Sequence, residues 1–392
     1  MKSSLPDSTL SGKRVFLRAD LNILTLNGKL VSDFRLQALR PTLSFLVKRE
    51  ARIILATHRG RPTSEDPELS TRHLVPWFEK NGYSILWVPT LEAAHEAVKD
   101  LKPGTILLLE NLRFRHEERA PESADAQAYA QYLKSLGDYY VNDAWAALHK
   151  NDVSLTLLPR LYPPHEKTIG FLIERELQYL KPLLKPDRPY VMMLGGAKLS
   201  KKIPLIEKAL EVADAVIVLP ALSFTFLKAQ GISVGESLVD DALLDHAQYI
   251  SEKAKSKGVS LVLPEDFVSG APDLRGPLST SREIPPGTKG ITVGPQSLER
   301  YEKIISSVRT IFFNGAMGFF ERPETLDPLK KLLQCIAQSN TYSVVGGGES
   351  TAAVSLFNLS KDISFCSTGG GATVTYITGG TLPGLYYTSP LE

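Results

Sequence analysis

The chain has 392 residues, of which 43% are hydrophobic and 22% charged, and its formal net charge is +2. This composition is typical of a globular protein with a sizeable core and two or three domains, and it excludes a disordered chain. The small net charge argues against a nucleic-acid partner, and the lack of an apolar run of 18 residues argues against a membrane partner. No signal-peptide segment opens the chain, and Cys335 and Cys366 form neither a metal motif nor a disulfide framework. These features predict a cytoplasmic protein.

The first half of the chain alternates short apolar strands with helices. Strands are expected at residues 15–17, 52–57, 83–88, 105–109 and 139–141. Helices are expected between them, at residues 34–47, 74–80, 91–101 and 124–136. This rhythm predicts a parallel sheet with helices on both faces. In such sheets ligands bind beyond the carboxyl ends of the strands.

Basic and hydrogen-bonding side chains follow four of the five strands expected in this half. They are Arg18, Asp20, Asn22, Arg35, His58, Arg59, Arg61, Arg113, His149 and Lys150. Any one of the arginines alone would be interpreted as a solvated surface charge. Their recurrence at strand ends favours a shared pocket instead. Because guanidinium groups bind phosphate and carboxylate through paired hydrogen bonds, we expect a small, highly anionic and phosphorylated ligand.

The middle of the chain is expected to join two halves. A helix is predicted over residues 171–184, followed by a break at Pro186 and a buried strand over residues 190–194. A Gly195-Gly196 turn then leads to a helix whose start is flanked by Lys198 and Lys202. Two lysines four residues apart, beside free backbone N–H groups, would attract an anion. The alternative is a linker helix followed by an ordinary α/β unit with solvated lysines.

The second half repeats the strand and helix rhythm but carries glycine turns. Strands are expected at residues 215–218, 259–263, 290–293, 310–313, 342–345 and 363–365. Helices are expected at residues 203–212, 223–230, 242–257 and 298–308 and from Glu349 onward. The turns GGGES and STGGGA would let backbone N–H groups approach a phosphate, although tight turns need glycine in any case.

Two features of this half bear on the type of ligand. Glu349 is either an acid that stabilises the start of a helix or a magnesium ligand. The sequence has neither GxxxxGK[ST] nor GxGxxG at the opening of a helix, which disfavours a P-loop nucleotide fold and a dinucleotide dehydrogenase.

Eleven motifs, in order, resemble those of the phosphoglycerate kinase family along nearly the whole chain. They are RADLN (18–22), THRGRP (57–62), LLLENLRF (107–114), VNDAW (141–145), GFLIERELQYL (170–180), GGAK (195–198), FTFLKAQG (224–231), NGAMGFFE (314–321), VVGGGES (344–350), STGGGA (367–372) and LPG (382–384).

The resemblance implies an α/β fold of two doubly wound, Rossmann-like parallel-sheet domains joined by a central hinge helix. Residues 1–169 would bind the triose phosphate, 170–185 would form the interdomain helix, and 186–375 would bind the nucleotide. Residues 376–392 would pack back on the first domain. The implied reaction moves a phosphoryl group reversibly from 1,3-bisphosphoglycerate to Mg-ADP, giving 3-phosphoglycerate and ATP. The resemblance further implies a monomer that acts in glycolysis and gluconeogenesis on small-molecule substrates, with Mg²⁺ as cofactor.

The resemblance also assigns roles to particular residues. The triose ligand would be bound by Asp20, Asn22, Arg35, His58, Arg61, Arg113 and Lys150. Groups at the transferring phosphoryl would be Arg18, Lys198, Lys202, Gly369, Gly370 and Gly371. The nucleotide would contact Lys198, Lys202, Leu219, Pro220, Asn314, Glu321, Gly347, Gly348, Glu349 and Ser350, with Glu349 on the metal.

The sequence departs from the family pattern mainly in the second half. Glu349 replaces an aspartate, Lys150 an arginine, Lys201 an aspartate and Ala316 a proline. Leu219, Pro220 and Ala221 replace three glycines, and their side chains are expected to occupy space beside the purine. Two functions remain open at this point. One is an active phosphotransferase with an altered nucleotide pocket, and the other is a non-catalytic triose-phosphate-binding protein on the same scaffold.

Overall fold

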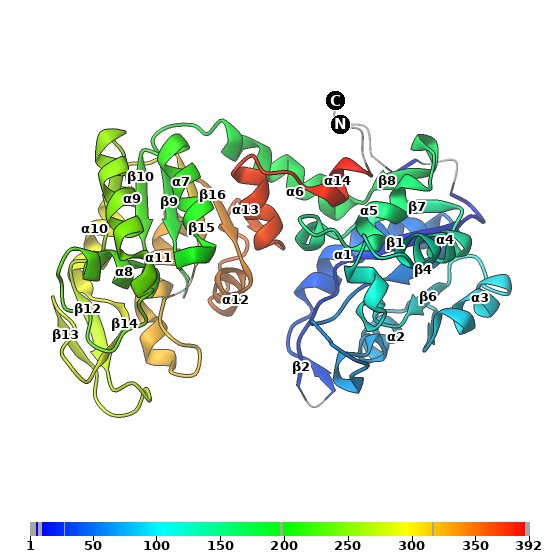
Figure 1. Cartoon of the computed structure of the whole chain (residues 1–392), viewed down its shortest axis with the longest axis horizontal. Helices are drawn as coiled ribbons and strands as arrows, with labels where there is room; N and C mark the ends of the chain where they lie inside the picture. Colours follow the sequence, from blue (N-terminus) through cyan, green and yellow to red (C-terminus); the bar gives the residue numbers. More distant parts are fainter. Residues whose placement is uncertain (1–4, 7–9, 27, 197–198, 316, 389–392) are drawn as a thin grey trace. The chain divides into compact units, whose positions relative to one another are not determined.

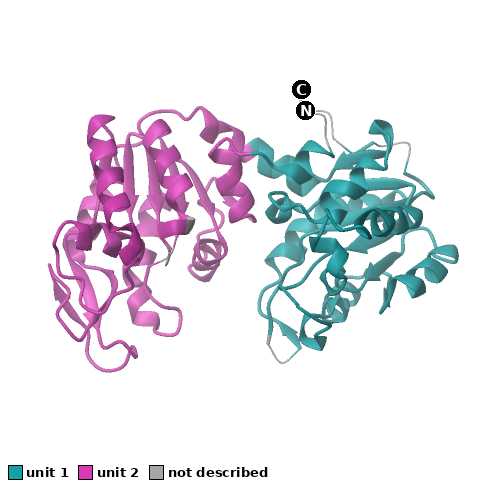
Figure 2. Ribbon diagram, in the orientation of Figure 1, with its two compact units in different colours: residues 1–178, 381–392 teal, residues 179–380 magenta. Residues whose placement is uncertain are grey.

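The structure is a computed structural model of the chain, and it describes residues 5–6, 10–26, 28–196, 199–315 and 317–388. The chain forms two compact units (Figure 2). Unit 1 comprises Met1–Gln178 and Thr381–Glu392, and unit 2 comprises Tyr179–Gly380. Each unit contains a six-stranded sheet of parallel strands with helices packed against it (Figure 1). The predicted α/β class with two doubly wound sheets is therefore confirmed.

The sheet of unit 1 has the strand order β5-β6-β4-β1-β7-β8. Its strands are β1 (Arg14–Ala19), β4 (Arg52–Ala56), β5 (Ile85–Val88), β6 (Ile106–Leu109), β7 (Tyr139–Asp143) and β8 (Lys167–Ile169). Its helices are α1 (Phe34–Lys48), α2 (Val75–Lys80), α3 (Leu91–Lys99), α4 (Ala126–Leu136) and α5 (Val153–Arg160). A hairpin of β2 (Thr25–Leu26) and β3 (Lys29–Leu30) precedes α1.

Both faces of this sheet are buried, as its uninterrupted apolar strands require. Along β1, Val15 and Leu17 belong to one buried cluster, whereas Phe16 belongs to another. Because successive side chains of a strand point to opposite faces, the two clusters lie on the two sides of the sheet. The order of the strands reverses between β1 and β7, and this places the predicted ligand crevice beside the end of β1.

The sheet of unit 2 has the strand order β11-β10-β9-β15-β16-β17, with its reversal between β9 and β15. Its strands are β9 (Tyr190–Leu194), β10 (Ala215–Val218), β11 (Ser260–Val262), β15 (Thr310–Asn314), β16 (Tyr342–Gly346) and β17 (Phe365–Ser367). Its helices are α7 (Ile203–Val212), α8 (Leu222–Ala229), α9 (Leu244–Ser256), α10 (Pro295–Ile305), α11 (Asp327–Gln338), α12 (Gly348–Leu356) and α13 (Gly371–Ile377).

The helix α6 (Phe171–Leu180) begins in unit 1, and its last residues belong to unit 2. The predicted helix over residues 171–184 is thus shorter, and it continues as a 3₁₀ turn, Lys181–Leu184, that contains Pro182. The C-terminal α14 (Pro383–Tyr386) packs against α5 of unit 1, where Gly384 N donates to Leu148 O at 3.0 Å. Among the described helices none has the length and apolarity to cross a bilayer.

Several parts of the fold differ from the sequence-based expectation. Residues 290–293 belong to β14 (Lys289–Val293), which lies in an antiparallel sheet with β12 (Phe267–Gly270) and β13 (Ser279–Ser281), not in a parallel one. The helix α5 was not predicted, because its interior contains Ser154, Thr156 and Pro159, which interrupt the apolar pattern. The helix α11 was missed although its buried leucines and Ile336 recur at helical spacing.

Candidate functional site

In unit 1, predicted site residues follow four neighbouring strands of the sheet. Asp20 follows β1, His58 follows β4, and Lys150 follows β7. Arg113 lies in the 3₁₀ turn Leu112–Phe114 that follows β6. Because these strands are adjacent and parallel, their carboxyl ends bring the four side chains to one edge of the sheet.

The loops that carry these residues are tied together by asparagine side chains. Asn111 Oδ1 accepts hydrogen bonds from the backbone N–H groups of Arg59, at 3.0 Å, and Arg113, at 3.1 Å. Asn22 Oδ1 accepts one from Gly60 N at 2.8 Å. The guanidinium of Arg59 is buried and donates to Ile23 O and Thr25 Oγ1 at 3.1 and 2.9 Å. The buried Arg59 therefore holds its own loop against the loop that contains Ile23 and Thr25.

Two arginines of the site are held by buried carboxylates. Arg35 forms an ion pair with Asp20, whose side chain is 5% exposed, while 26% of the Arg35 side chain stays accessible. Burial opposes the ionisation of Asp20, but the cations Arg35 and Arg18 hold the pKa of that carboxyl below its ordinary value. Asp20 is therefore ionised and directs Arg35.

Arg113 is fixed in a similar way. Its Nη2 donates to Asp152 Oδ2 and its Nη1 to Gly60 O, both at 2.9 Å. Arg61, one residue beyond Gly60, is exposed. Arg113 is thus a cation fixed by its partners, whereas Arg61 is a cation accessible to solvent.

Arg18 is a buried member of the site in unit 1. Its side chain is fully buried, and its nitrogen atoms donate to Ser154 Oγ, Ala19 O and His58 Nδ1. The predicted place of Arg18 at a transferring phosphoryl group stays a prediction. Ser154 and Glu118, which complete the network around Arg18, were missed because an isolated serine and a Glu-Glu pair give no sequence signal of burial.

In unit 2, polar contacts join the turns that follow β9, β15 and β16. Lys202 Nζ donates to Asn314 Oδ1, and Asn314 Nδ2 donates to Gly346 O at 2.7 Å. Gly195 N donates to Asn314 O at 2.9 Å. Because the order of the sheet reverses between β9 and β15, Asn314 lies at the position where a doubly wound sheet binds its ligand.

Glycines allow these turns to approach one another closely. A Cβ on Gly315 would lie 2.4 Å from both N and Cα of Gly195. Gly347 has a φ of +101°, and a Cβ there would lie 3.0 Å from Asn314 Nδ2. A Cβ on Gly370 would lie 4.0 Å from Gly347 Cα, so the turn that opens α13 at Gly371 lies beside the turn that opens α12. These backbone groups could surround a phosphate.

Ser350 belongs to the support of this site. Its side chain is buried, and its Oγ accepts a hydrogen bond from Gly315 N at 2.9 Å and donates to Gly315 O at 2.7 Å. Gly348 and Glu349 are exposed at the first two positions of α12. Glu321 is exposed in the turn before Arg322 and takes no part in the contacts above.

The two predicted lysines are not equivalent in the structure. Lys202 is the N-cap of α7, and burial lowers its pKa to about 8 against the opposing effect of Glu349. Lys198 lies outside the described residues, as does Ala316. The predicted common helical face of the two lysines therefore stays a prediction.

The segment Leu219–Ala221 differs from expectation. Leu219 is fully buried in the core cluster of unit 2, and Pro220 is buried as well. The Leu219 side chain packs into the core, and the expectation that it occupies space beside a purine stays a prediction. Ala221 is half-buried with φ 68° and ψ −58°, and it packs against the cluster that contains Phe224.

The residues around α12 fit a metal ion that arrives with a nucleotide. In the described part of the chain no group of three or more His, Cys, Asp or Glu could enclose a metal ion. Mg²⁺ in phosphoryl-transfer sites commonly takes one or two carboxylates and completes its shell with phosphate oxygens and water. The exposed carboxylate of Glu349 meets that requirement.

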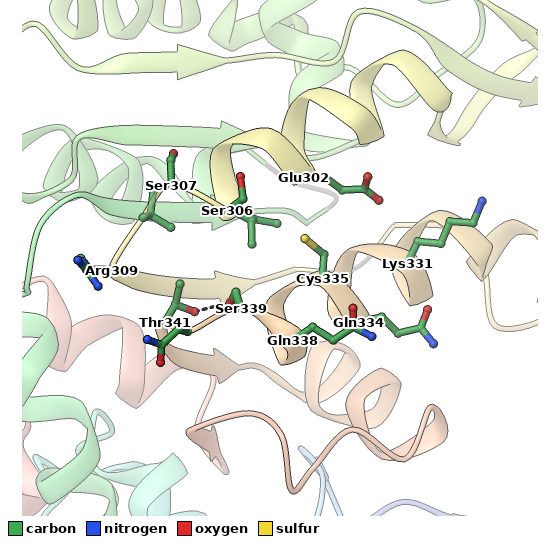
Figure 3. A pocket seen from close by; sticks show the side chains of 13 residues that line it. Glu302, Ser306, Ser307, Arg309, Lys331, Gln334, Cys335, Gln338, Ser339 and Thr341 are labelled. Atoms are coloured by element: carbon green, nitrogen blue, oxygen red, sulfur yellow. Dashed lines mark hydrogen bonds between the residues drawn. The ribbon is translucent and has the colours of Figure 1, made fainter.

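A hollow of about 740 Å³ lies at the other edge of the sheet in unit 2 (Figure 3). Its lining comes from the ends of α10 and α11 and from the residues that lead into β15 and β16, and it includes Glu302, Lys331 and Cys335. Parallel strands begin at this edge, whereas Asn314 and Gly347 lie where they end. The hollow is therefore separate from the candidate site.

The comparisons with known proteins agree on one family. The family model described as phosphoglycerate kinase matches residues 5–380. A phosphoglycerate kinase of Chlamydia trachomatis serovar L2 is 37% identical, with 100% of this chain and 99% of that protein aligned. One from Anaeromyxobacter dehalogenans is 39% identical over 96% of each. The solved phosphoglycerate kinase of Pyrococcus horikoshii OT3 matches with a TM-score of 0.87 at 30% identity over 98% of both chains. That of Coxiella burnetii matches with a TM-score of 0.79 at 32% identity, covering 97% of this chain and 96% of the other.

Proposed function

The chain belongs to the phosphoglycerate kinase family and is a phosphotransferase of glycolysis, and we propose how its residues divide the reaction between the two units. Its substrates are small molecules, a triose phosphate and a nucleotide. The likenesses to phosphoglycerate kinases give no support to the alternative of a non-catalytic binding protein. The proposal concerns which residues hold each substrate and which residue acts on the moving phosphoryl group.

Unit 1 binds the triose substrate. The observation that carries this assignment is the convergence of cationic side chains at the carboxyl ends of four adjacent strands. Arg35 and Arg113 are directed by Asp20 and Asp152, and Arg61 is exposed beside them. Guanidinium groups held in this way bind phosphate and carboxylate without a further ordering cost to their own side chains.

Unit 2 binds the nucleotide through backbone N–H groups and one lysine. The turns at Gly347 and Gly370 adjoin each other, and Lys202 reaches Asn314 at the reversal point of the sheet. Glu349 would hold the Mg²⁺ of the Mg-nucleotide. Leu219 and Pro220, which are buried, form the floor behind the nucleotide and make no contact with it.

The reaction exchanges one P–O bond for another. A terminal phosphate oxygen of ADP attacks phosphorus, and the bond from phosphorus to the acyl oxygen of 1,3-bisphosphoglycerate breaks with its electron pair. The leaving group is already a stable carboxylate, so the protein needs to position groups and stabilise charge rather than transfer a proton. Lys202 supplies a mobile cation to the oxygens of the moving group. Bound Mg²⁺ neutralises charge on the nucleotide phosphates.

The protein is further proposed to act as a monomer in the cytoplasm, since each substrate is assigned to residues of one chain and the family serves glycolysis. Analytical ultracentrifugation of the purified protein, with and without substrates, tests the first statement. Fractionation of cells that express the chain tests the second.

A coupled assay tests the proposed division most directly. The purified protein is given 3-phosphoglycerate and Mg-ATP. The formation of 1,3-bisphosphoglycerate is monitored with a coupling enzyme that reduces this product. The same assay is run with GTP and other triphosphates to define base preference, and calorimetry measures the affinity of each substrate alone. We expect turnover with ATP and independent binding of both substrates. The assignment would be contradicted if the folded protein turned over its substrates but bound no 3-phosphoglycerate in the absence of nucleotide.

A further inference from the structure

The fully buried Arg18 contacts the ring of His58 in unit 1. Arg18 Nη2 lies 3.1 Å from His58 Nδ1, and both side chains are almost completely excluded from solvent. A guanidinium has only donors, so Nδ1 of His58 must accept this hydrogen bond. Burial, together with the cations Arg18, Arg113 and Lys150, lowers the pKa of His58 well below its ordinary value, although Asp20 opposes this. The ring is therefore neutral, and its single proton is on Nε2.

The orientation of Arg18 is itself fixed by two buried residues. Arg18 Nε donates to Ser154 Oγ at 2.8 Å, and Ser154 Oγ donates to Glu118 Oε1. Glu118 Oε2 accepts from Ser154 N at 3.1 Å. This chain of bonds leaves Nη2 of Arg18 facing His58. Rotation of the guanidinium would break several buried hydrogen bonds at once.

Nε2 of His58 faces a second donor. Lys150 Nζ lies 3.4 Å from His58 Nε2, so an N–H and an ammonium group face each other in the ligand-free site. Neither can accept from the other while both are protonated. An anionic oxygen that enters here would accept from both, which relieves the mismatch.

We propose that Arg18 holds His58 in the tautomer that directs Nε2–H toward Lys150, so that the two residues donate together to one anionic oxygen of the triose substrate. Arg18 is thus a positioning residue, which acts through His58 rather than on the substrate. The proposal rests on the proposed function for the identity of the ligand, whereas the tautomer of His58 is a property of the ligand-free protein.

The arrangement makes triose affinity sensitive to alkaline pH. Lys150 is surrounded by Arg18, Arg113, His58 and His149 as cationic or donor groups and by Asp20 and Asp152 as acids. Burial first, and then Arg113, lower the pKa of Lys150 to about 8 despite the two acids. Lys150 is charged below this pH and becomes neutral as the pH rises through it. Binding of an anion favours the charged form, so the site takes up a proton on binding above pH 8.

The first experiment identifies the tautomer by NMR. Protein labelled with ¹⁵N at histidine is studied without ligand at pH 7.5, and the two ring nitrogens of His58 are assigned by comparison with His58→Gln. We expect a protonated Nε2 and an unprotonated Nδ1. A proton on Nδ1 would overturn the proposal. In Arg18→Gln, whose amide can also donate to Nδ1, the tautomer should persist, whereas in Arg18→Leu both tautomers should appear. If these variants fail to fold, the wild-type spectrum alone decides.

The second experiment measures the dissociation constant of 3-phosphoglycerate by calorimetry between pH 7 and pH 9.5, without nucleotide. The phosphate ester has lost its second proton by pH 7, so the ligand charge stays constant. Affinity should fall about tenfold per pH unit above pH 8, a loss of about 30-fold at pH 9.5. Lys150→Arg should bind with a flat profile, because arginine stays charged. Lys99→Arg, at an exposed position, should keep the wild-type profile.

The outcomes separate the two proposals. A flat wild-type profile with intact triose binding overturns the shared-oxygen arrangement and leaves the proposed function in place. A Lys150→Arg profile that still falls above pH 8 assigns the titration to another group and also overturns it. Absence of triose binding at every pH contradicts the proposed function, while the NMR result on ligand-free protein still decides whether Arg18 sets the tautomer.

Discussion

The two candidate half-sites are built in different ways. In unit 1 the ligand-binding groups are side chains that hold one another, as when Asp152 fixes Arg113 and Asp20 fixes Arg35. In unit 2 the groups are mainly backbone turns, packed so closely that a Cβ on Gly315 would overlap Gly195. Lys202 is a charged side chain that enters this second arrangement.

The difference shows where each half-site can be damaged. A site of paired side chains tolerates changes at its exposed members, but it loses both binding and stability when one partner of a buried pair is removed. A site of close backbone turns tolerates changes where space is open and fails where a Cβ cannot fit. The predictions below test this contrast, from the largest expected effect to the smallest.

Arg113→Ala should remove triose binding and destabilise unit 1. The change removes the 2.9 Å partner of the nearly buried Asp152 and leaves it with more distant cations, of which Arg18 lies at 3.9 Å. Removing one member of a buried ion pair costs about 3–5 kcal/mol of stability. Separate calorimetric titrations should show loss of 3-phosphoglycerate binding and nearly unchanged nucleotide affinity, and a thermal scan should show the destabilisation.

Arg61→Ala is the matched control for this variant. Arg61 is exposed in the same group of loops, so its removal should weaken triose binding while changing stability by less than about 0.5 kcal/mol. Equal loss of nucleotide and triose affinity in Arg113→Ala would contradict the independence of the two half-sites.

Lys202→Ala should lower turnover by about 10²–10³ with smaller changes in either Michaelis constant. The reason is that a partly buried cation aimed at Asn314 is proposed to act on the moving phosphoryl group. Steady-state kinetics in both substrates provide the measurement. Lys208→Ala, on the same helix and paired with Glu211, should keep wild-type kinetics. Full turnover with weakened nucleotide binding would make Lys202 a ground-state binding residue.

The pKa of Lys202 adds a pH test. Burial lowers this pKa to about 8, so the charged form is present below pH 8 and is lost as the pH rises through that value. The kcat/KM for the nucleotide, which reports groups of the nucleotide-free protein, should therefore decline above pH 8, and Lys202→Arg should retain more of its own kcat/KM at pH 9. A parallel decline in both proteins would assign the titration to another group.

The sequence predicted the fold well, and it predicted at which edge of the sheet the cations of unit 1 lie, because both depend on residue type. Apolar runs predicted the buried strands, and the cations after β4, β6 and β7 marked the edge of the sheet. The role of Arg18 could not be predicted, since its burial depends on Ser154 and Glu118, which are more than 90 residues away in sequence. Burial of a charged group is a property of the assembled fold.

The glycine-built site of unit 2 was less predictable. The glycine clusters marked the turns correctly, but tight turns use glycine whether or not they bind a ligand. Leu219 was interpreted as a residue of the pocket, whereas the structure buries it in the core. A replacement of glycine by leucine does not reveal on which side of the turn the new side chain lies. The short antiparallel strands β12 and β13 gave no usable period either.

Gly315→Ala should disrupt unit 2 while Gly348→Ala should not. A Cβ at residue 315 would lie 2.4 Å from backbone atoms of Gly195, whereas one at residue 348 meets no atom within 4 Å. Forcing an extra methyl group into a packed region costs about 1–3 kcal/mol, and here the backbone itself must move. We expect lower thermal stability and weaker nucleotide binding in Gly315→Ala, with triose binding preserved. Similar behaviour of the two variants would contradict the backbone-built site.

The smallest expected effect concerns Ala221, the N-cap of α8. Its φ of 68° and ψ of −58° lie in a region that side-chain-bearing residues rarely adopt, and such strain costs about 1–3 kcal/mol. Glycine would relieve that strain but would raise the entropy of the unfolded chain by the equivalent of about 0.4–1 kcal/mol. Ala221→Gly should therefore stabilise the protein by about 1 kcal/mol, which corresponds to a rise of about 2–4 °C in Tm for a domain of this size.

Substitution of the neighbouring Leu219 by glycine should lower the stability of the protein, in contrast to Ala221→Gly. Leu219 is fully buried in the core cluster, and truncating a buried leucine costs about 2–5 kcal/mol, so Leu219→Gly should lower Tm. ADP and GDP titrations of both variants complete the test. Because neither Leu219 nor Pro220 is exposed, restoring glycine at residue 219 should not tighten ADP binding. If Leu219→Gly bound ADP more tightly, the Leu219 side chain would limit the nucleotide site. If Ala221→Gly gained no stability, the backbone strain at residue 221 would have no energetic consequence.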